Sequence, residues 1–322
     1  MLLAKEGKLI GFPPVTGILT RDMSIQASDK AAVCAVVVTY FPPASCAQHL
    51  TAIASQVGKL LIVDNGSSEE SLQPVVACAP RLGASLVRLG ANRGVAAALN
   101  VGVRFAAECG CAWLATFDQD SEATPGMIEE MLRVVQSHPD VKHVGVVSPR
   151  RVDPRSGFTV REPGGAHSSD AWRAIPTTMT SGSLVNLAAI ALVGGFEDAL
   201  FIDYVDHEFC LRLRRHGYRI VEASRARLLH SLGALERRRF IFKRISVTHH
   251  ATVRRYYMTR NRLILWRRYW RREPRWVLGD VRRFLSETLF VLLYEKQAHS
   301  KVAMVWRGLR DGAKSIGGPF AA

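Results

Sequence analysis

Two acidic residues separated by one position close an apolar run near the middle of the chain. Asp118 and Asp120 follow residues 113–117 (WLATF), a run typical of a buried strand. Open α/β sheets bind ligands at the carboxyl ends of their strands, so both carboxylates would lie at that edge. Hard oxygen ligands suit Mg²⁺ or Mn²⁺, and such a cation can bridge a diphosphate. Taken alone, the motif fits a solvated acidic turn equally well.

Three other titratable residues extend this hypothesis. Asp64 follows the apolar run 60–63, so its carboxylate could accept the imide N–H of a uracil or thymine ring, or serve an ordinary turn. Asp206 begins an expected helix over 206–216, where it could deprotonate a hydroxyl or act as an N-cap. His230 could be a third metal or diphosphate contact, or a structural histidine.

A glycine-containing segment adds a candidate phosphate site. Asn92, Gly94 and Asn100 bracket the start of a helix expected over 95–108. Free backbone N–H groups at a helix N-terminus favour a phosphate, although a simple helix entry through glycine gives the same pattern.

The elements that must position these residues alternate between strand and helix. Apolar and β-branched runs predict strands over 32–39, 60–63, 85–89, 113–117 and 144–148. Regular structure is expected to return at 181–185, before a helix that runs through Ala191. Helical spacing predicts helices over 44–57, 95–108, 125–137 and 206–216, and residues 150–178 are expected to form a loop. This rhythm favours a mainly parallel, Rossmann-like sheet flanked by helices.

Charge divides the chain unevenly. The 322 residues carry a net charge of +15, and residues 236–322 hold 21 Lys/Arg against 6 Asp/Glu, so the preceding part is neutral overall. We therefore expect a flexible extension over 1–30, a catalytic domain over 31–235 and a basic helical region over 236–322. The six cysteines lack the C-x₂-C spacing of a zinc site, and the N-terminus does not read as a signal peptide, so a cytoplasmic protein is expected.

The basic region interleaves arginine with aromatic residues, as in RRYY and WRRYWRR. It has no apolar run long enough to span a bilayer, and its pattern favours an amphipathic helix lying on an anionic membrane surface. An ordinary basic subdomain packed on the catalytic domain is the structural alternative. A nucleic-acid-binding protein or a noncatalytic membrane scaffold would also carry such charge, but acidic strand ends repel a polyanion, so we expect no nucleic acid partner.

Five segments in order resemble the inverting family 2 glycosyltransferases of the GT-A fold, and among them the bacterial rhamnosyltransferases. They are VVVTYFP, VDNGS, GANRGVAAALNVG, TFDQDS and GGFEDALFIDYVDHEFCLRLRRHGY, spread over residues 32–262 together with the later RRYYMTRNR. The resemblance implies a GT-A fold, dTDP-L-rhamnose as donor, and Mg²⁺ or Mn²⁺ as cofactor.

The resemblance also implies roles for particular residues. The nucleotide-sugar site would comprise Thr39, Asp64, Asn92, Arg93, Asn100 and Asp118. Asp120 and His230 would hold the metal, Ser181 and Gly182 would line the acceptor pocket, and Asp206 would be the catalytic base. Val205 departs from the family pattern, because many relatives carry an acid before the base.

The expected reaction is inverting, metal-dependent transfer of rhamnose to a hydroxyl of a glycolipid acceptor at the inner face of the cytoplasmic membrane. The C-terminal pattern resembles the second rhamnosyltransferase of rhamnolipid synthesis, which favours a mono-rhamnolipid acceptor. Extension of a lipid-linked O-antigen or another surface polysaccharide is the alternative acceptor, because loops rather than the fold determine acceptor choice.

Overall fold

The computed structural model describes residues 29–153, 159–160, 170–230, 235–240, 243–248 and 251–321. Most of the extension expected over 1–30 lies outside the described residues. The first described element is a single 3-10 turn, η1 (Lys30–Ala32), which leads directly into the first strand.

A ten-stranded sheet forms the body of the protein, in the order β3-β2-β1-β4-β9-β6-β10-β5, with β7 beside β6 and β8 beside β10. The strands are β1 (Val33–Thr39), β2 (Lys59–Asp64), β3 (Ser85–Arg88), β4 (Trp113–Asp118), β5 (Ser121–Ala123), β6 (Val144–Val152), β7 (Thr159–Val160), β8 (Trp172–Ile175), β9 (Ser183–Asn186) and β10 (Arg219–His230). The first four are mutually parallel, and β9 runs antiparallel between β4 and β6. Six strands, namely β1–β4, β6 and β10, share one direction as the sequence predicts, and the sheet is mixed because β5, β7, β8 and β9 run against them.

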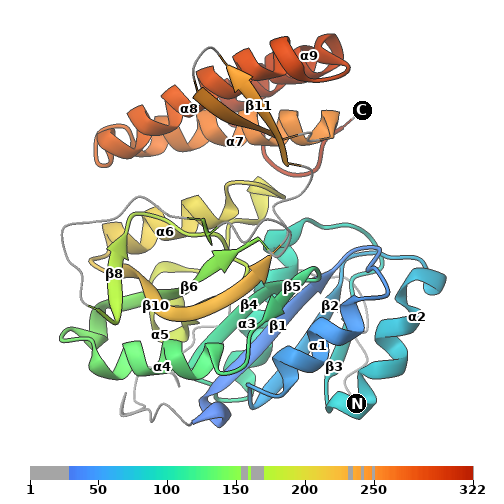
Figure 1. Cartoon of the computed structure of the whole chain (residues 1–322), viewed down its shortest axis with the longest axis vertical. Helices are drawn as coiled ribbons and strands as arrows, with labels where there is room; N and C mark the ends of the chain where they lie inside the picture. The colour runs from blue at the N-terminus through green and yellow to red at the C-terminus, as the bar shows by residue number, and fades with distance from the viewer. Residues whose placement is uncertain are drawn as a thin grey trace.

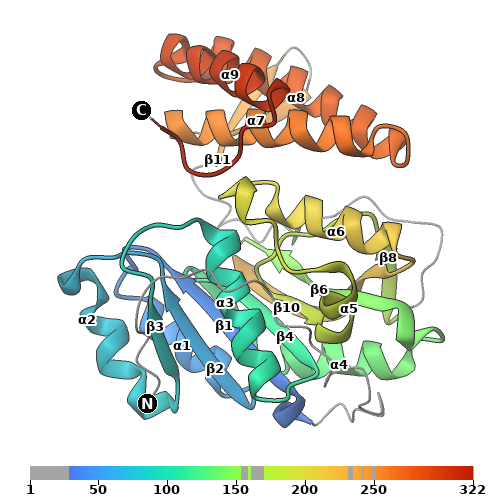
Figure 2. The same cartoon turned by 180° about the vertical axis from the view of Figure 1, so that it is seen from behind.

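Helices cover both faces of this sheet (Figures 1 and 2). They are α1 (Cys46–Ala54), α2 (Glu69–Cys78), α3 (Val95–Glu108), α4 (Met127–Ser137), α5 (Leu187–Val193) and α6 (Val205–Arg215). Successive side chains of β1 point to opposite faces, so Val37 packs in one core and Val36 in the other. A continuous apolar run is what a strand covered on both faces requires, and this is why β1 could be predicted.

The stretch 150–178, expected to be a loop, contains regular structure. β6 continues to Val152, and β8 pairs antiparallel with β10. Across that pair, Arg173 donates to the buried carboxylate of Glu222 at 2.8 Å. Arg173 therefore provides a hydrogen-bond donor for a buried acid within the sheet. The polar composition of residues 150–178 is the reason that the strand was not predicted.

The C-terminal region forms a separate layer above the sheet (Figure 1). It begins with a hairpin of β11 (Leu235–Phe240) and β12 (Lys243–Thr248), followed by α7 (Thr252–Tyr269), α8 (Pro274–Tyr294) and α9 (Ala298–Ala313). The region expected to be wholly helical thus starts with two strands. Among the described residues, no helix combines the length and the apolar character needed to cross a membrane.

Part of the expected basic surface is turned inward. Arg255, Arg260 and Arg262 of α7 are buried, and Arg255 pairs with Glu295 between the helices. Charge in this region therefore holds the layer together as well as facing solvent.

Candidate active site

The carboxyl ends of three adjacent strands bring the first predicted residues together. In the parallel register, Thr39 of β1 lies opposite Asp64 of β2, and Val38 lies opposite Asp118 of β4. Each strand ends at the same edge, so residues far apart in sequence share one rim of the sheet. This edge is where an open α/β sheet places its ligand.

Asp64 is engaged by its own turn. Its carboxylate is buried and accepts hydrogen bonds from the Thr39 hydroxyl at 3.2 Å, from the Ser67 amide at 3.0 Å, and from the Ser67 hydroxyl. These contacts fit the turn interpretation, and they also hold the carboxylate rigidly at the sheet edge. Its role toward a nucleoside base remains a prediction.

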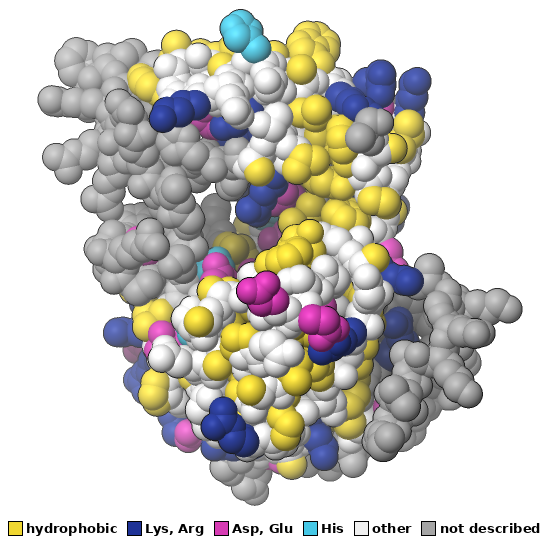
Figure 3. Space-filling model, turned by 90° about the vertical axis from the view of Figure 1, so that its right-hand side faces the viewer, with side chains coloured by type: hydrophobic (Ala, Val, Ile, Leu, Met, Phe, Trp, Pro, Cys, Tyr) yellow, Lys and Arg dark blue, Asp and Glu magenta, His cyan; other side chains and the backbone are white. Residues whose placement is uncertain are grey.

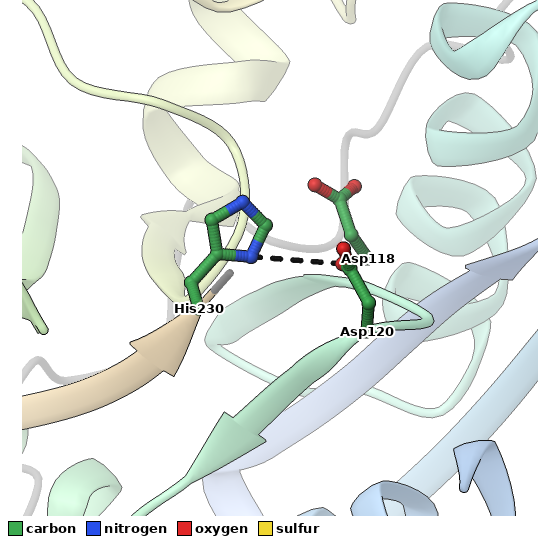
Figure 4. Close-up of side chains that lie close together, drawn as sticks. All are labelled: Asp118, Asp120 and His230. Carbon is green, nitrogen blue, oxygen red and sulfur yellow. Dashed lines mark ion pairs between the residues drawn. The ribbon is translucent and has the colours of Figure 1, made fainter. Parts of the chain in front are cut away.

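Asp118, Asp120 and His230 form a cluster that could hold a cation (Figure 4). One ligand atom from each residue lies within 4.8 Å of the others, and His230 Nδ1 is 3.6 Å from an Asp120 oxygen. His230 reaches the cluster because it ends β10, which pairs with β5 immediately after the Asp118–Asp120 turn. Two carboxylates and one imidazole are a suitable donor set for Mg²⁺ or Mn²⁺.

A chain of hydrogen-bonded hydroxyl groups connects His230 to the backbone of Asp118. Ser121 Oγ lies 2.9 Å from His230 Nδ1 and 2.7 Å from Ser181 Oγ, and Ser181 Oγ accepts from the Asp118 amide at 3.0 Å. While His230 Nδ1 keeps this contact, Nε2 is the ring nitrogen available to a metal. Hydrogen bonds of this kind fix the orientation of metal ligands. Sequence reasoning missed Ser121.

The two residues expected at the acceptor pocket are hydrogen-bonded to the segment that carries the candidate cation site. Ser181 is buried and its hydroxyl is committed to the chain just described. The Gly182 amide donates to the Thr116 carbonyl at 2.6 Å, which ties this turn to β4. Contact of either residue with an acceptor remains a prediction, and the support of Asp118 by Ser181 is what the structure describes.

Asp206 lies in the first turn of α6, on a different element from those that carry Asp118, Asp120 and His230. It is the second residue of α6, whose N-cap position is held by Tyr204 without a side-chain cap. The N-cap alternative for Asp206 therefore does not describe this helix. Its carboxylate accepts from the adjacent His207 amide at 2.7 Å and is partly exposed.

The electrostatics of the cluster connect these acids. Burial raises the pKa of Asp118, the negative charges of Asp120 and Asp206 raise it further, and His230 and Arg254 oppose the rise. Asp206 is thus close enough to influence Asp118 through space. A site crowded with carboxylates favours a cation, which removes their mutual repulsion.

The loop before α6 contributes an ion pair that sequence reasoning did not assign. Arg254, near the start of α7, donates from Nη2 to the Asp203 carboxylate at 2.9 Å and from Nε at 3.0 Å. Burial raises the pKa of Asp203, and Arg254 counteracts this rise. The helical layer therefore contacts the loop before α6 directly. Figure 3 shows a hollow between the two layers.

The segment expected to bind phosphate is internally bonded. Asn92 Oδ1 accepts from the Gly94 amide at 3.0 Å and from Asn65, and the Arg93 amide donates to Asn65 Oδ1 at 2.8 Å. Asn100 is buried and donates to the Phe196 carbonyl at 2.8 Å. The structure places Asn92 and Arg93 at the entry to α3, whereas Asn100 lies inside that helix. Their contacts with a donor remain predictions.

With this geometry in place, sequence comparison identifies the class of protein. Residues 34–183 match the family model described as "Glycosyl transferase family 2", a span that contains all but the first residue of β1, together with β4 and the Asp118–Asp120 turn. The protein carries a family 2 glycosyltransferase domain and is a glycosyltransferase.

The comparison extends to a bacterial enzyme. The chain is 28% identical to the dTDP-rhamnosyl transferase RfbF of Shigella flexneri over 245 residues, which cover 73% of this chain and 79% of that protein. This similarity supports membership among the bacterial rhamnosyltransferases.

Solved structures share the fold at low identity. TarS residues 1–349 from S. aureus with UDP-GlcNAc has a TM-score of 0.57 at 14% identity, covering 88% of this chain and 81% of that one. The mannosyltransferase PcManGT from Pyrobaculum calidifontis with GDP-Man and Mn²⁺ has a TM-score of 0.54 at 16% identity, covering 94% and 79%. GalNAc-T7 with UDP, GalNAc and Mn²⁺ has a TM-score of 0.56 at 11% identity, and the chain covers only 56% of it. The GT-A-like fold is therefore shared.

Proposed function

We propose that this protein transfers L-rhamnose from dTDP-L-rhamnose to a hydroxyl of a glycolipid, with inversion at the anomeric carbon. One observation carries the proposal: Asp118, Asp120 and His230 come together at the ends of β4 and β10, with one ligand atom of each within 4.8 Å of the others. Asp206, at the start of α6, is among the charges that raise the pKa of Asp118. In this proposal, the base and the cation site adjoin the same sheet edge. The similarity to a dTDP-rhamnosyl transferase supports the choice of donor.

In this proposal, Asp118, Asp120 and His230 hold Mg²⁺ or Mn²⁺. Such a cation supplies Lewis-acid stabilisation of the diphosphate charge. Ser121 and Ser181 keep the ligands oriented through the hydroxyl chain that joins His230 to the Asp118 amide.

The residues on the acceptor side perform the proton transfer. Asp206 accepts the proton of the acceptor hydroxyl while the hydroxyl oxygen forms a bond to the anomeric carbon. The bond from that carbon to the phosphate oxygen breaks on the opposite face, and its electron pair leaves with dTDP. Protonated Asp206 then returns its proton to solvent, so the cycle is balanced without a covalent intermediate.

The helical layer supports a membrane location for the acceptor. The outward face of α8 carries exposed leucines, namely Leu278, Leu285, Leu289, Leu292 and Leu293. Three exposed arginines accompany them, namely Arg275, Arg282 and Arg283. The acids of α8, Asp280 and Glu287, turn inward and pair with Arg262. Apolar burial combined with basic charge and no exposed acid along α8 suits an anionic lipid surface.

We therefore propose a peripheral enzyme on the inner face of the cytoplasmic membrane. A mono-rhamnolipid is the favoured acceptor, because RRYYMTRNRLILWRRYWRREP and the later ETLFVLLYEKQ resemble the second rhamnosyltransferase of rhamnolipid synthesis. A lipid-linked saccharide of a surface polysaccharide is the second candidate. It fits the same membrane face and the same donor.

Product mass tests the proposal. The purified protein is incubated with a panel of nucleotide sugars, with Mg²⁺ or Mn²⁺, and with mono-rhamnolipid or a lipid-linked saccharide. We expect one deoxyhexose to be added from dTDP-L-rhamnose, and the acceptor that gains it identifies the pathway. Transfer from another nucleotide sugar, with none from dTDP-L-rhamnose, would contradict the proposed donor.

A further inference from the structure

The loop that precedes α6 has an unusual backbone. Phe201, Asp203 and Tyr204 have φ values of 65°, 60° and 65°, and they are three of the six described non-glycine residues with positive φ. Such a backbone conformation is unfavourable for a non-glycine residue and persists only where its surroundings impose it. The next residues along the chain are Val205 and Asp206, so this loop sets the position of the proposed base.

The contacts that impose this backbone come from α7. Asn261 is fully buried, and its Nδ2 lies 2.9 Å from the Leu200 carbonyl and 2.8 Å from both the Ile202 and the Asp203 carbonyls. One side-chain amide thus gathers three backbone carbonyls of the loop. These carbonyls belong to residues 200, 202 and 203, which lie within or next to the positive-φ segment.

Arg260 orients this amide. Its Nε donates to Asn261 Oδ1 at 2.9 Å, which turns Nδ2 toward the loop. Its Nη2 also donates to the Leu200 carbonyl at 2.9 Å, and Nη1 donates to the Gly318 carbonyl at 2.6 Å. Arg260 is fully buried, so its charge is solvated by these carbonyls and by the rings of Tyr256 and Tyr257.

The loop is also held by α3, the helix whose entry carries Asn92 and Arg93. The Phe201 carbonyl accepts from the Val95 amide at 2.7 Å, at the first turn of α3. The Phe201 ring stacks on Tyr257 of α7 with ring centroids 5.1 Å apart. The strained loop therefore lies between the entry to α3 and the helical layer.

We propose that Asn261 is a positioning residue, which, oriented by Arg260, holds residues 200–203 so that Asp206 faces the acidic cluster. The inference rests on the proposed function, because it assigns to the C-terminal layer the placement of the proposed base. It gives that layer a second task, distinct from contact with a membrane. A mutation far from the reacting atoms that misplaces a catalytic group by about 1 Å costs about a hundredfold in rate.

The test compares Asn261→Ala with Lys301→Ala. Lys301 pairs with Glu295 at 2.6 Å in the same helical layer. Within the described residues it makes no hydrogen bond or ion pair to the loop, so its loss weakens the layer without touching residues 200–203. We expect Asn261→Ala to lower kcat by about a hundredfold while the KM for donor and the Kd for dTDP with Mn²⁺ change less than about threefold. Lys301→Ala should keep kcat within about threefold, even with an equal fall in Tm.

Two results would overturn the inference. One is a kcat for Asn261→Ala close to that of the unmodified protein, and the other is an equal loss of kcat in Lys301→Ala. If Asn261→Ala does not fold, Arg260→Lys removes the hydrogen bond to Asn261 Oδ1 and retains the charge. We expect that variant to lose kcat selectively, and an unchanged kcat counts against the positioning role.

A parallel Asp206→Asn variant separates this inference from the proposed function. If Asp206→Asn is active and Asn261→Ala is not, the loop matters but Asp206 is not the base, so the inference as stated fails together with that assignment. If Asp206→Asn is inactive and Asn261→Ala is fully active, only the positioning role fails.

Discussion

His230 and Ser121 lie opposite each other in the antiparallel pair of β10 and β5, with Nδ1 2.9 Å from Oγ. This pairing brings the last residue of β10 to the turn that carries Asp118 and Asp120. The sheet itself therefore assembles the candidate cation site, because β5 follows the turn directly. The site depends on strand register more than on loop conformation.

Removal of the imidazole tests the cation site. We expect His230→Ala to lower the affinity for Mn²⁺ at least about tenfold, since metal sites typically lose this much with one supporting group. Titration of free Mn²⁺ by electron paramagnetic resonance measures the change. Glu122→Gln is the matched control, because Glu122 lies in the same segment with its side chain exposed. Equal affinities in all three proteins would rule out His230 as a ligand.

Ser121→Ala probes the hydroxyl chain behind the ligands. Loss of this hydroxyl leaves His230 Nδ1 and the Ser181 hydroxyl without the partner they share, so we expect a loss of about 1–3 kcal/mol in the free energy of unfolding. Affinity for Mn²⁺ should also fall. The control is Ser148→Ala, because the Ser148 hydroxyl is buried and has no partner in the described part of the chain. If the Ser121 variant is as stable as the Ser148 variant, the hydrogen-bonded hydroxyl groups of Ser121 and Ser181 do not stabilise the site.

Gly94→Ala tests the close approach of the loop to α3. Gly94 has φ +86°, and a Cβ there would lie 2.5 Å from the Phe201 carbonyl oxygen. Gly194→Ala is matched in backbone conformation, with φ +89°, but its Cβ would meet only the end of the Arg212 side chain at 3.1 Å. We expect Gly94→Ala to have a lower urea midpoint than Gly194→Ala. The corresponding difference in the free energy of unfolding should be about 1–3 kcal/mol. The reverse order would show that residues 94 and 201 are not in contact.

Leu285→Glu tests the membrane face of α8. Leu285 is 61% exposed, and so is Leu192 on α5 of the sheet domain, which makes Leu192→Glu a control of the same chemistry. We expect the unmodified protein to sediment with phosphatidylglycerol vesicles more than with phosphatidylcholine vesicles, and less as salt rises. Leu285→Glu should lose this binding, whereas Leu192→Glu should retain it. Equal losses in both variants would show that α8 is not the membrane face.

The sheet and its acidic edge could be predicted because their signals are local. Residues 33–38 form a continuous apolar run that only a strand covered on both faces requires, and Asp118 follows such a run directly. The helix from Val95 to Glu108 begins and ends where its sequence pattern does.

The parts that escaped prediction depend on pairing between distant segments. The link between Ser121 and His230 exists only through the register of β5 and β10. Arg260 and Asn261 are fully buried although charged and polar residues are usually exposed, so their sequence indicated a surface helix. Their partners are backbone carbonyls, which no residue pattern reveals.

Asp206→Asn is the most direct test of the central proposal that this carboxylate deprotonates the acceptor. Single-turnover transfer from dTDP-L-rhamnose is measured alongside dTDP binding in the presence of Mn²⁺. We expect binding to be retained and the transfer rate to fall about 10²–10⁴-fold, the range attributed to general bases. A variant that transfers rhamnose at the unmodified rate would contradict the assignment of Asp206 as the base.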